Sequence, residues 1–333
     1  MKALMSIAAG GPETLVLSET LDPTPGPGEA VVRVRACGVN FPDVLMIEDR
    51  YQFKPDRPYA PGGEVAGEVA AVGEGVTNVK VGDRVLGNSG HGGLAQMVAV
   101  EAWRLFKIPP AMPFEEAAAL ITTFGTTYHA FRERSSLKPG QTLLVLGASG
   151  GVGLSAVALG KAMGARVIAA CSTQAKLDIC LGHGADAGVV YGRGPFDRDG
   201  QKKLAELFKD AVGPDGADVI YDAVGGDYAE PALRAIAWEG RYLVIGFAAG
   251  DIPRIPINLA LLKGCEIVGV FWGAWVTRNP QAHMRNIAEL LDLCAQGKIR
   301  PIVSETFPLA RGGEAIARLK NREAVGKVVV TID

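Results

Sequence analysis

The residues VLGASGGVG, numbered 145–153, decide how the middle of this 333-residue chain is expected to fold. The apolar segment TLLVLG (142–147) predicts a strand, and the residues after the glycines predict a helix. A strand, a glycine-rich turn and a helix in this order are typical of a dinucleotide-binding unit, whose helix N-terminus binds phosphate. A glycine-rich turn without any ligand is the alternative interpretation. The predicted phosphate contacts are Ala148, Ser149, Gly150, Gly151, Val152 and Gly153, with Ala148, Gly150 and Gly153 at the small-residue positions.

From residue 141 onward, strand-like and helix-like segments alternate. This alternation predicts a parallel sheet with helices on both faces, and six strands make a complete doubly wound dinucleotide fold. The predicted strands are TLLVLG, RVIAAC, AGVVY, DVIYDAV, RYLVIGF and EIVGVF, and the predicted helices are residues 151–163, 174–181, 201–211, 228–237 and 257–262.

The first part of the chain has a different pattern. Short segments with turn signals between them, at 29–39, 63–73 and 79–87, predict a small β-barrel. A helical pattern begins at residue 114, and one helix and two closing strands are predicted after residue 273. We therefore expect a discontinuous first domain, residues 1–120 plus 273–333, with a dinucleotide-binding domain of residues 121–272 inserted into it.

Composition excludes several classes of protein. The net charge of −2 with interspersed signs gives no reason to expect a nucleic-acid partner or an anionic membrane surface. No segment approaches the eighteen or so apolar residues of a membrane span, so we expect no membrane partner. The five cysteines form no C-x-x-C pair, which favours reduced thiols in a cytoplasmic protein.

The end of the second predicted strand indicates the cofactor. An NAD-binding chain usually has an Asp or Glu there, which bonds the ribose 2′-hydroxyl and would repel a 2′-phosphate. This chain has Cys171, Ser172 and Thr173, followed by Lys176. Hydroxyls and a cation can bind a 2′-phosphate through charge-assisted hydrogen bonds, so the predicted cofactor is NADPH. The alternative makes Ser172 a helix N-cap and Lys176 an exposed helix residue.

Several further segments carry a resemblance to a known family. CGVNFPDVLMIEDRYQ (37–52), PGGEVAGEVAAVGEGV (61–76), VIYDAVGG (219–226) and LLKGCEIVGVFWG (261–273) resemble the zinc-independent quinone oxidoreductase, or ζ-crystallin-like, branch of the medium-chain dehydrogenase/reductases. The resemblance covers nearly the whole chain. It implies an α/β protein with a GroES-like β-barrel domain, an inserted doubly wound Rossmann domain, and pairing into a homodimer through the sheet edge.

The resemblance also implies the site residues. Asn40 and Tyr51 are expected at the catalytic centre, although Asn40 could instead serve a turn and Tyr51 the core. Glu64 could pair with Arg33 or Arg84, and His129 is expected to be structural. Trp272 and Tyr191 have core packing as their alternative. Beyond the phosphate turn, the implied cofactor contacts are Thr126, Ser172, Lys176, Tyr191, Gly246, Phe247, Ala248, Phe271, Trp272, Gly273 and Lys327.

No metal is expected. Zinc-dependent relatives have metal ligands at positions that match Asn40, Gly63 and, approximately, Thr122 in this chain. None of these side chains is a His, Cys or carboxylate, and a catalytic zinc needs about three such ligands.

Three functions remain open at this stage. The leading hypothesis is an NADPH-dependent reductase acting on quinones, a small conjugated carbonyl substrate. The second is a reductase of C=C bonds in enones or enoyl thioesters, for which Arg50, Lys54 and Arg57 would be basic residues near the thioester carrier. The third is an NADPH-binding protein with little catalysis.

Overall fold

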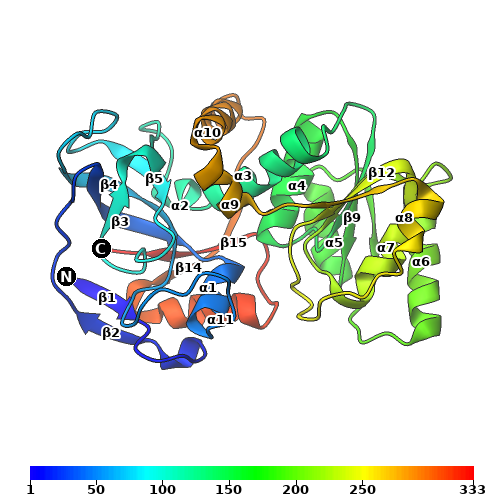
Figure 1. Ribbon diagram of the computed structural model, residues 1–333, viewed down its shortest axis with the longest axis horizontal. Helices are drawn as coiled ribbons and strands as arrows, with labels where there is room; N and C mark the ends of the chain where they lie inside the picture. The colour runs from blue at the N-terminus through cyan, green and yellow to red at the C-terminus, as the bar shows by residue number, and fades with distance from the viewer. The chain divides into compact units, whose positions relative to one another are not determined.

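The computed structural model describes all residues from 1 to 333, and the chain divides into two compact units (Figure 1). The first unit is Met1–Thr122 with Pro301–Asp333, and the second is Thr123–Arg300. Residues 273–300, expected in the first domain, therefore group with the second. They do so because this segment packs on the helix Ile121–His129 of the second unit, where the Trp275 ring stacks on the His129 ring with their centroids 4.2 Å apart.

Six parallel strands form the sheet of the second unit, in the order β10-β9-β8-β11-β12-β13. This is the 3-2-1-4-5-6 order of a doubly wound dinucleotide fold, so the predicted sheet is confirmed. The strands are β8 Thr142–Leu146, β9 Arg166–Cys171, β10 Ala187–Val190, β11 Ala217–Asp222, β12 Ile236–Val244 and β13 Glu266–Gly269.

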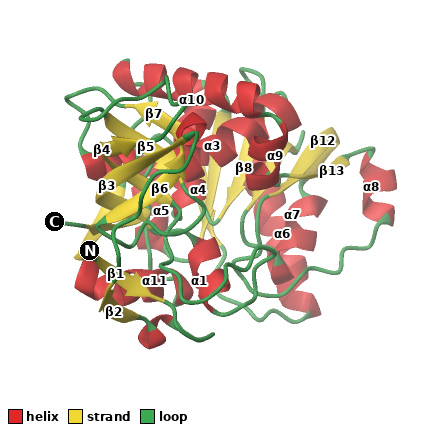
Figure 2. Cartoon of the chain, turned by 60° about the vertical axis from the view of Figure 1, so that its left-hand side comes forward, coloured by secondary structure: helices red, strands yellow, loops and turns green.

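Helices cover both faces of this sheet. In both views α6 and α7 lie together on one side of it, and they contact each other (Figure 1, Figure 2). Their apolar side chains, such as Phe208 and Leu233, pack on Leu144 and Ile168 of the sheet. The helices are α3 Ile121–His129, α4 Gly151–Ala162, α5 Gln174–Gly182, α6 Arg198–Val212, α7 Ala229–Arg234, α8 Asn258–Lys263, α9 Trp272–Arg278 and α10 Pro280–Ala295.

The first unit is built on a seven-stranded sheet in which β3 pairs with β15, β4 and β6. Inward-facing valines such as Val32, Val65, Val85 and Val330 form its core. The strands are β3 Glu29–Gly38, β4 Glu64–Val72, β5 Arg84–Asn88, β6 Met97–Glu101, β7 Leu105–Lys107, β14 Val303–Pro308 and β15 Lys327–Thr331, with β1 Lys2–Met5 and β2 Val16–Glu19 as a separate pair.

Two helices of the first unit were not expected, α1 Phe41–Ile47 and α11 Gly312–Lys320, and they lie beside each other (Figure 2). The third is α2 Phe114–Ala117, where a helical pattern was expected. The predicted strand 79–87 begins only at Arg84, because Lys80 and Asp83 close a turn in which the Lys80 amide donates to the Asp83 carboxylate at 2.9 Å. No helix in the structure is both long enough and apolar enough to span a membrane.

Candidate functional site

The predicted phosphate turn joins β8 to α4 at the carboxyl end of the parallel sheet. Gly147 has a φ of 66°, a conformation that glycine adopts without strain. A Cβ atom at Gly153 would lie 2.2 Å from the Gly147 carbonyl oxygen, so only glycine allows the helix to start this close to the turn.

The N-terminus of α4 has the features of an anion site. Its N-cap residue, Gly150, contributes no side-chain hydrogen bond to the helix amides. The first-turn amides of α4 therefore lack partners within the helix and lie at the positive end of the helix dipole. A phosphate can accept hydrogen bonds from these amides, and its negative charge is attracted by the dipole. The turn fits the pyrophosphate of a dinucleotide, which would be held by these amides.

The end of β9 carries cations and hydroxyls and no carboxylate. Thr173 is the N-cap of α5 and accepts a hydrogen bond from the Lys176 amide at 3.3 Å, so the interpretation of Ser172 as the cap is wrong. Burial lowers the pKa of Lys176, and the nearby Arg193 guanidinium lowers it further. Two cations held near each other at a strand end fit the 2′-phosphate of NADPH. Arg193 was not recognised from the sequence, because it lies in the loop after β10.

Tyr191 lies between the phosphate turn and the packed core. Its ring is 4.8 Å from that of Tyr228, while burial and the neighbouring Cys171 raise the pKa of its hydroxyl. A hydrogen bond from the Gly147 backbone lowers the pKa of the same hydroxyl. The expected contact role and the packing alternative are therefore compatible for Tyr191.

Backbone hydrogen bonds connect the loop at the carboxyl end of β12 to the loop after β11. The Gly246 amide donates to the Asp222 carbonyl at 3.3 Å, and the Ala248 amide donates to the Ala223 carbonyl at 3.2 Å. Asp222 is buried, and its carboxylate accepts from the Val224 and Gly225 amides and from the Tyr242 hydroxyl. Asp222 lies in the VIYDAVGG segment, and no pattern in the sequence indicated its role.

The other predicted residues of the second unit differ in exposure. Trp272 is 8% exposed, and its ring covers Gly125, where a Cβ would lie 2.9 Å from it. Phe271 is 56% exposed, which leaves it accessible, and Thr126 is half-buried. His129 bonds Glu133 at 3.1 Å through Nδ1 and is buried, which agrees with its expected structural role.

A cluster of buried polar groups forms the candidate centre of the first unit. The Lys327 ammonium donates to Glu64 Oε2 at 2.7 Å, to Asn40 Oδ1 at 2.8 Å and to the Val39 carbonyl at 3.0 Å. Glu64 is 0% exposed and Lys327 is 4% exposed, so the pair is shielded from water. The expected pairing of Glu64 with Arg33 or Arg84 is wrong, because the carboxylate points into the interior.

The same cluster fixes the orientation of the Asn40 amide. Its Nδ2 donates to Glu64 Oε2 at 2.9 Å and to the Gly38 carbonyl at 3.2 Å. A carboxylate only accepts and an ammonium only donates, so Oδ1 must face Lys327 and Nδ2 must face Glu64. Both Nδ2 hydrogens are used, and Asn40 can therefore only accept a further hydrogen bond.

Asp43 connects this cluster to Tyr51. The Asp43 carboxylate accepts from the backbone amide of Asn40 at 2.7 Å and from the backbone amide of Gly62 at 3.1 Å. Burial raises the pKa of Asp43 to about 6, against the lowering effect of these hydrogen bonds and of Lys327. Burial also raises the pKa of the half-buried Tyr51, and the charge of Asp43 adds to that effect. Tyr51 therefore keeps its proton at neutral pH and can donate it in a hydrogen bond.

The three positions that the family resemblance matches to metal ligands, Asn40, Gly63 and Thr122, lie around Glu64. Asn40 donates to its carboxylate, Gly63 precedes it, and the Thr122 amide donates to Glu64 Oε1 at 2.9 Å. The structure has no group of three His, Cys, Asp or Glu side chains arranged to hold a metal ion. The cation at the centre of these groups is the Lys327 ammonium.

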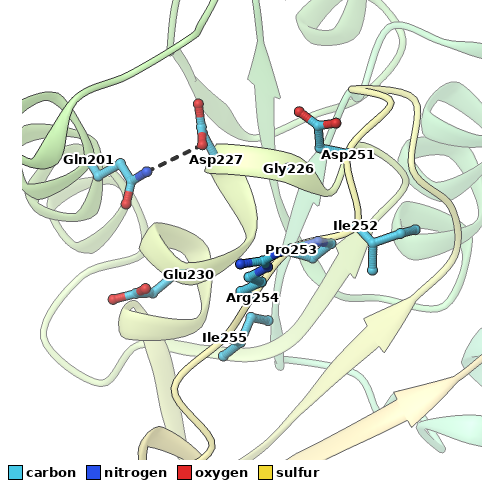
Figure 3. A pocket seen from close by; sticks show the side chains of 9 residues that line it. All are labelled: Gln201, Gly226, Asp227, Glu230, Asp251, Ile252, Pro253, Arg254 and Ile255. Atoms are coloured by element: carbon cyan, nitrogen blue, oxygen red, sulfur yellow. Dashed lines mark hydrogen bonds between the residues drawn. The ribbon is translucent and has the colours of Figure 1, made fainter.

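A separate pocket of about 280 Å³ lies beside α6 and α7, and no predicted site residue lines it (Figure 3). Gln201 donates to Asp227 at 3.3 Å across one end of it. Its lining residues are Gln201, Gly226, Asp227, Glu230, Asp251, Ile252, Pro253, Arg254 and Ile255.

The two units together define a two-domain oxidoreductase with a dinucleotide cofactor, and comparison with known proteins specifies the class. Residues 26–110 match the alcohol dehydrogenase GroES-like domain, and residues 151–292 match the family described as zinc-binding dehydrogenase. A quinone oxidoreductase-like protein 2 homolog of Nematostella vectensis is 39% identical over 92% of this chain and 82% of its own length.

Solved structures agree with this placement. An Escherichia coli quinone oxidoreductase complexed with NADPH superposes with a TM-score of 0.90 at 28% identity, covering 99% of this chain and 100% of that one. A mycobacterial protein complexed with NADPH gives 0.91 at 30% identity, covering 99% of each chain. The chain belongs to the quinone oxidoreductase branch of the medium-chain dehydrogenase/reductases. The predicted fold, GroES-like barrel plus Rossmann domain, is confirmed.

Proposed function

We propose that this NADPH-dependent oxidoreductase reduces quinones without zinc. The observation that carries the cofactor assignment is the end of β9, where Lys176 and Arg193 lie near each other and no carboxylate is present. An acid at this position would repel the 2′-phosphate, and two cations attract it. The neighbouring structures that contain NADPH support the same cofactor.

The second unit binds and orients the cofactor in this proposal. When bound, NADPH supplies the hydride that a conjugated carbonyl compound accepts. The first-turn amides of α4 bind the pyrophosphate, and Ser172, Lys176 and Arg193 bind the 2′-phosphate. The remaining contacts are proposed for Thr126, Tyr191, Gly246, Phe247, Ala248, Phe271, Trp272 and Gly273.

Asn40 and Tyr51 have different roles in the proposed reaction. The Asn40 amide can only accept, because Lys327 and Glu64 hold it in one orientation. A quinone oxygen that gains negative charge needs a donor, and the protonated Tyr51 hydroxyl can provide it. We assign Tyr51 as the hydrogen-bond donor to the substrate oxygen and Asn40 as an acceptor. Lys327 acts as a positioning residue, although it was expected among the cofactor contacts.

Zinc independence is part of the proposal and rests on the Lys327 ammonium. It donates to Asn40 and Glu64, at the positions where zinc-dependent relatives bind their metal. A second cation at this position would meet a charge of the same sign within a few ångströms. Stoichiometric zinc that survives dialysis, measured by elemental analysis, would contradict this part.

The enoyl-thioester alternative receives little support from the loop after α1. Two of its three basic residues are already neutralised by acids: Arg50 pairs with Glu48 at 3.2 Å, and Arg57 pairs with Asp49 at 2.7 Å. A phosphate-bearing carrier would have to compete with these partners. A quinone has no phosphate and does not need these arginines for binding.

We also propose a homodimer in a reducing, cytoplasmic setting. All five cysteines are free thiols. The sheet edge at β13 is flanked by large exposed apolar side chains, namely Trp238 at 70%, Ile257 at 75%, Leu261 at 80% and Leu262 at 66%. A surface of this kind is typical of an interface.

The test compares initial rates of NADPH and NADH oxidation with an ortho-quinone and with a crotonyl thioester. We expect quinone turnover with NADPH, and equal or tighter binding of NADH would overturn the cofactor assignment. Preference for the thioester would transfer the protein to the enoyl reductases. NADPH binding without turnover on either compound would support the binding-protein hypothesis.

The matched variant for the chemistry is Tyr51→Phe. Loss of one transition-state donor lowers kcat by about 100-fold or more, while the dissociation constant of NADPH stays the same. Tyr59→Phe is the control, because it makes the same chemical change at a buried tyrosine that has no role in the proposed reaction and packs against Arg57 and His91. Equal activity of Tyr51→Phe and the parent protein would remove Tyr51 from the mechanism.

A further inference from the structure

Two cysteines of the second unit lie close enough to react with each other. Cys171 is the last residue of β9 and Cys180 lies in α5, and their Sγ atoms are 3.6 Å apart. Cys171 is 1% exposed and Cys180 is 0% exposed. The proposed reduction uses neither thiol.

The surroundings of Cys171 belong to the proposed cofactor site. The hydrogen bond from the Cys180 thiol lowers the pKa of Cys171, burial opposes this, and the amide and hydroxyl of Ser149 and the charge of Lys176 lower it again. Ser149 is part of the phosphate turn, and Lys176 is proposed to bind the 2′-phosphate. The Cys171 sulfur thus lies near two groups that are proposed to bind NADPH, Ser149 and Lys176.

We propose that Cys171 and Cys180 form an oxidation site for hydroperoxides, in which Cys171 is the attacking sulfur and Cys180 the resolving one. The Cys171 thiolate attacks a peroxide oxygen, the O–O bond breaks, and one water leaves after taking up a proton. The Cys180 sulfur then attacks the Cys171 sulfenic acid, loses its proton and displaces a second water. In sum, two thiols and one hydrogen peroxide give one disulfide and two waters.

The disulfide would disturb the phosphate turn. A disulfide holds its sulfurs about 2.05 Å apart, so the two atoms must approach by about 1.5 Å. This movement draws the Cys171 sulfur from Ser149 and pulls on α5, whose first turn carries Lys176. We therefore expect the oxidised protein to bind NADPH more weakly, an expectation that rests on the proposed cofactor site.

The coupling must act in both directions. If the disulfide weakens NADPH binding, bound NADPH disfavours the disulfide by the same factor. Both sulfurs are buried, so peroxide reaches them only when the turn opens locally, and a bound dinucleotide suppresses that opening. The protein would therefore be protected from oxidation while reduced cofactor is abundant.

The experiment treats the full-length protein with hydrogen peroxide, blocks remaining thiols with iodoacetamide and maps peptides by mass spectrometry. We expect a Cys171–Cys180 disulfide that dithiothreitol reverses, and slower formation when NADPH is present. Cys180→Ser should instead give a Cys171 sulfenic acid that dimedone traps. Cys265→Ser is the matched control and should behave as the parent protein does.

A second readout separates this proposal from the proposed function. NADPH titration by fluorescence before and after oxidation should show about a tenfold increase in the dissociation constant, restored by dithiothreitol. A disulfide with unchanged NADPH affinity would overturn the coupling. Both thiols still reduced at a peroxide dose that oxidises Cys265 would overturn the oxidation site. The peptide map does not depend on NADPH binding, so a wrong cofactor assignment would be recognised separately.

Discussion

At the scale of single residues, the first unit depends on one buried ion pair. Lys327 and Glu64 are both removed from water, and their interaction at 2.7 Å is favourable only because other groups satisfy the remaining donors and acceptors. The Lys327 ammonium has three N–H groups and three protein acceptors. No proton of Lys327 is left for a substrate.

Lys327→Met should destabilise the protein by about 3–5 kcal/mol, because it leaves the Glu64 carboxylate buried without a counter-charge. The double variant Lys327→Met with Glu64→Gln should lose less than the sum of the two single changes, with a coupling of about 1–3 kcal/mol. Urea unfolding of all four proteins measures this cycle. Simple additivity would show that the two side chains do not interact.

This pair also shows what single-sequence reasoning cannot resolve. Glu64 and Lys327 are 263 positions apart, and no local pattern connects them. Asn40 was selected through family resemblance, and its fixed orientation became visible only with the neighbours from β4 and β15 in place. The family resemblance gave no reason to expect a metal ligand set here, yet it did not reveal the ammonium among these groups.

At the scale of elements, the phosphate turn is the segment whose structure depends most clearly on its residue types. Gly153→Ala should weaken NADPH binding about tenfold or more, because the new methyl group would lie 2.2 Å from the Gly147 oxygen and must displace the turn. Cofactor titration measures the effect. The control is Gly182→Ala, at a helical position where a Cβ meets nothing within 4 Å. Equal affinities for both variants would contradict the proposed binding of phosphate at this turn.

Other elements could not be predicted for a physical reason. The helix α11 begins with Gly312 and Gly313, which in a sequence favour a turn. In the structure a Cβ at Gly313 would lie 2.7 Å from the Pro12 carbonyl oxygen, a backbone atom, so packing against residues 12–14 requires the glycine and overrides its low helix propensity. By contrast, most strands of the second unit and the helices after them were predicted within a few residues at their ends, because periodicity and turn residues agree there. The exception is β12, which begins at Ile236, inside the predicted helix 228–237 and before the predicted strand start at Arg241.

At the scale of the whole molecule, the exposed leucines of α8 determine the expected oligomeric state. The double change Leu261→Asp with Leu262→Asp places charges in the proposed dimer interface, and light scattering should then give the mass of one chain instead of two. Leu21→Asp is the control, because Leu21 is 93% exposed and lies in the first unit, away from β13 in the sequence. A parent protein that is already monomeric would remove the interface from the proposal.

The position of Lys327 in the last strand also has a consequence for biosynthesis. Glu64 leaves the ribosome early in synthesis. Its counter-charge, Lys327, is translated 263 residues later, after the complete inserted unit. The nascent chain should therefore fold from its middle outward, with Thr123–Arg300 compact while the first unit still awaits β14 and β15. Chains stalled when residue 300 has left the ribosome, with β14 and β15 still enclosed or untranslated, should then resist protease in the inserted unit and be cleaved in residues 1–122. Residues that are translated far apart in time would thus complete one site.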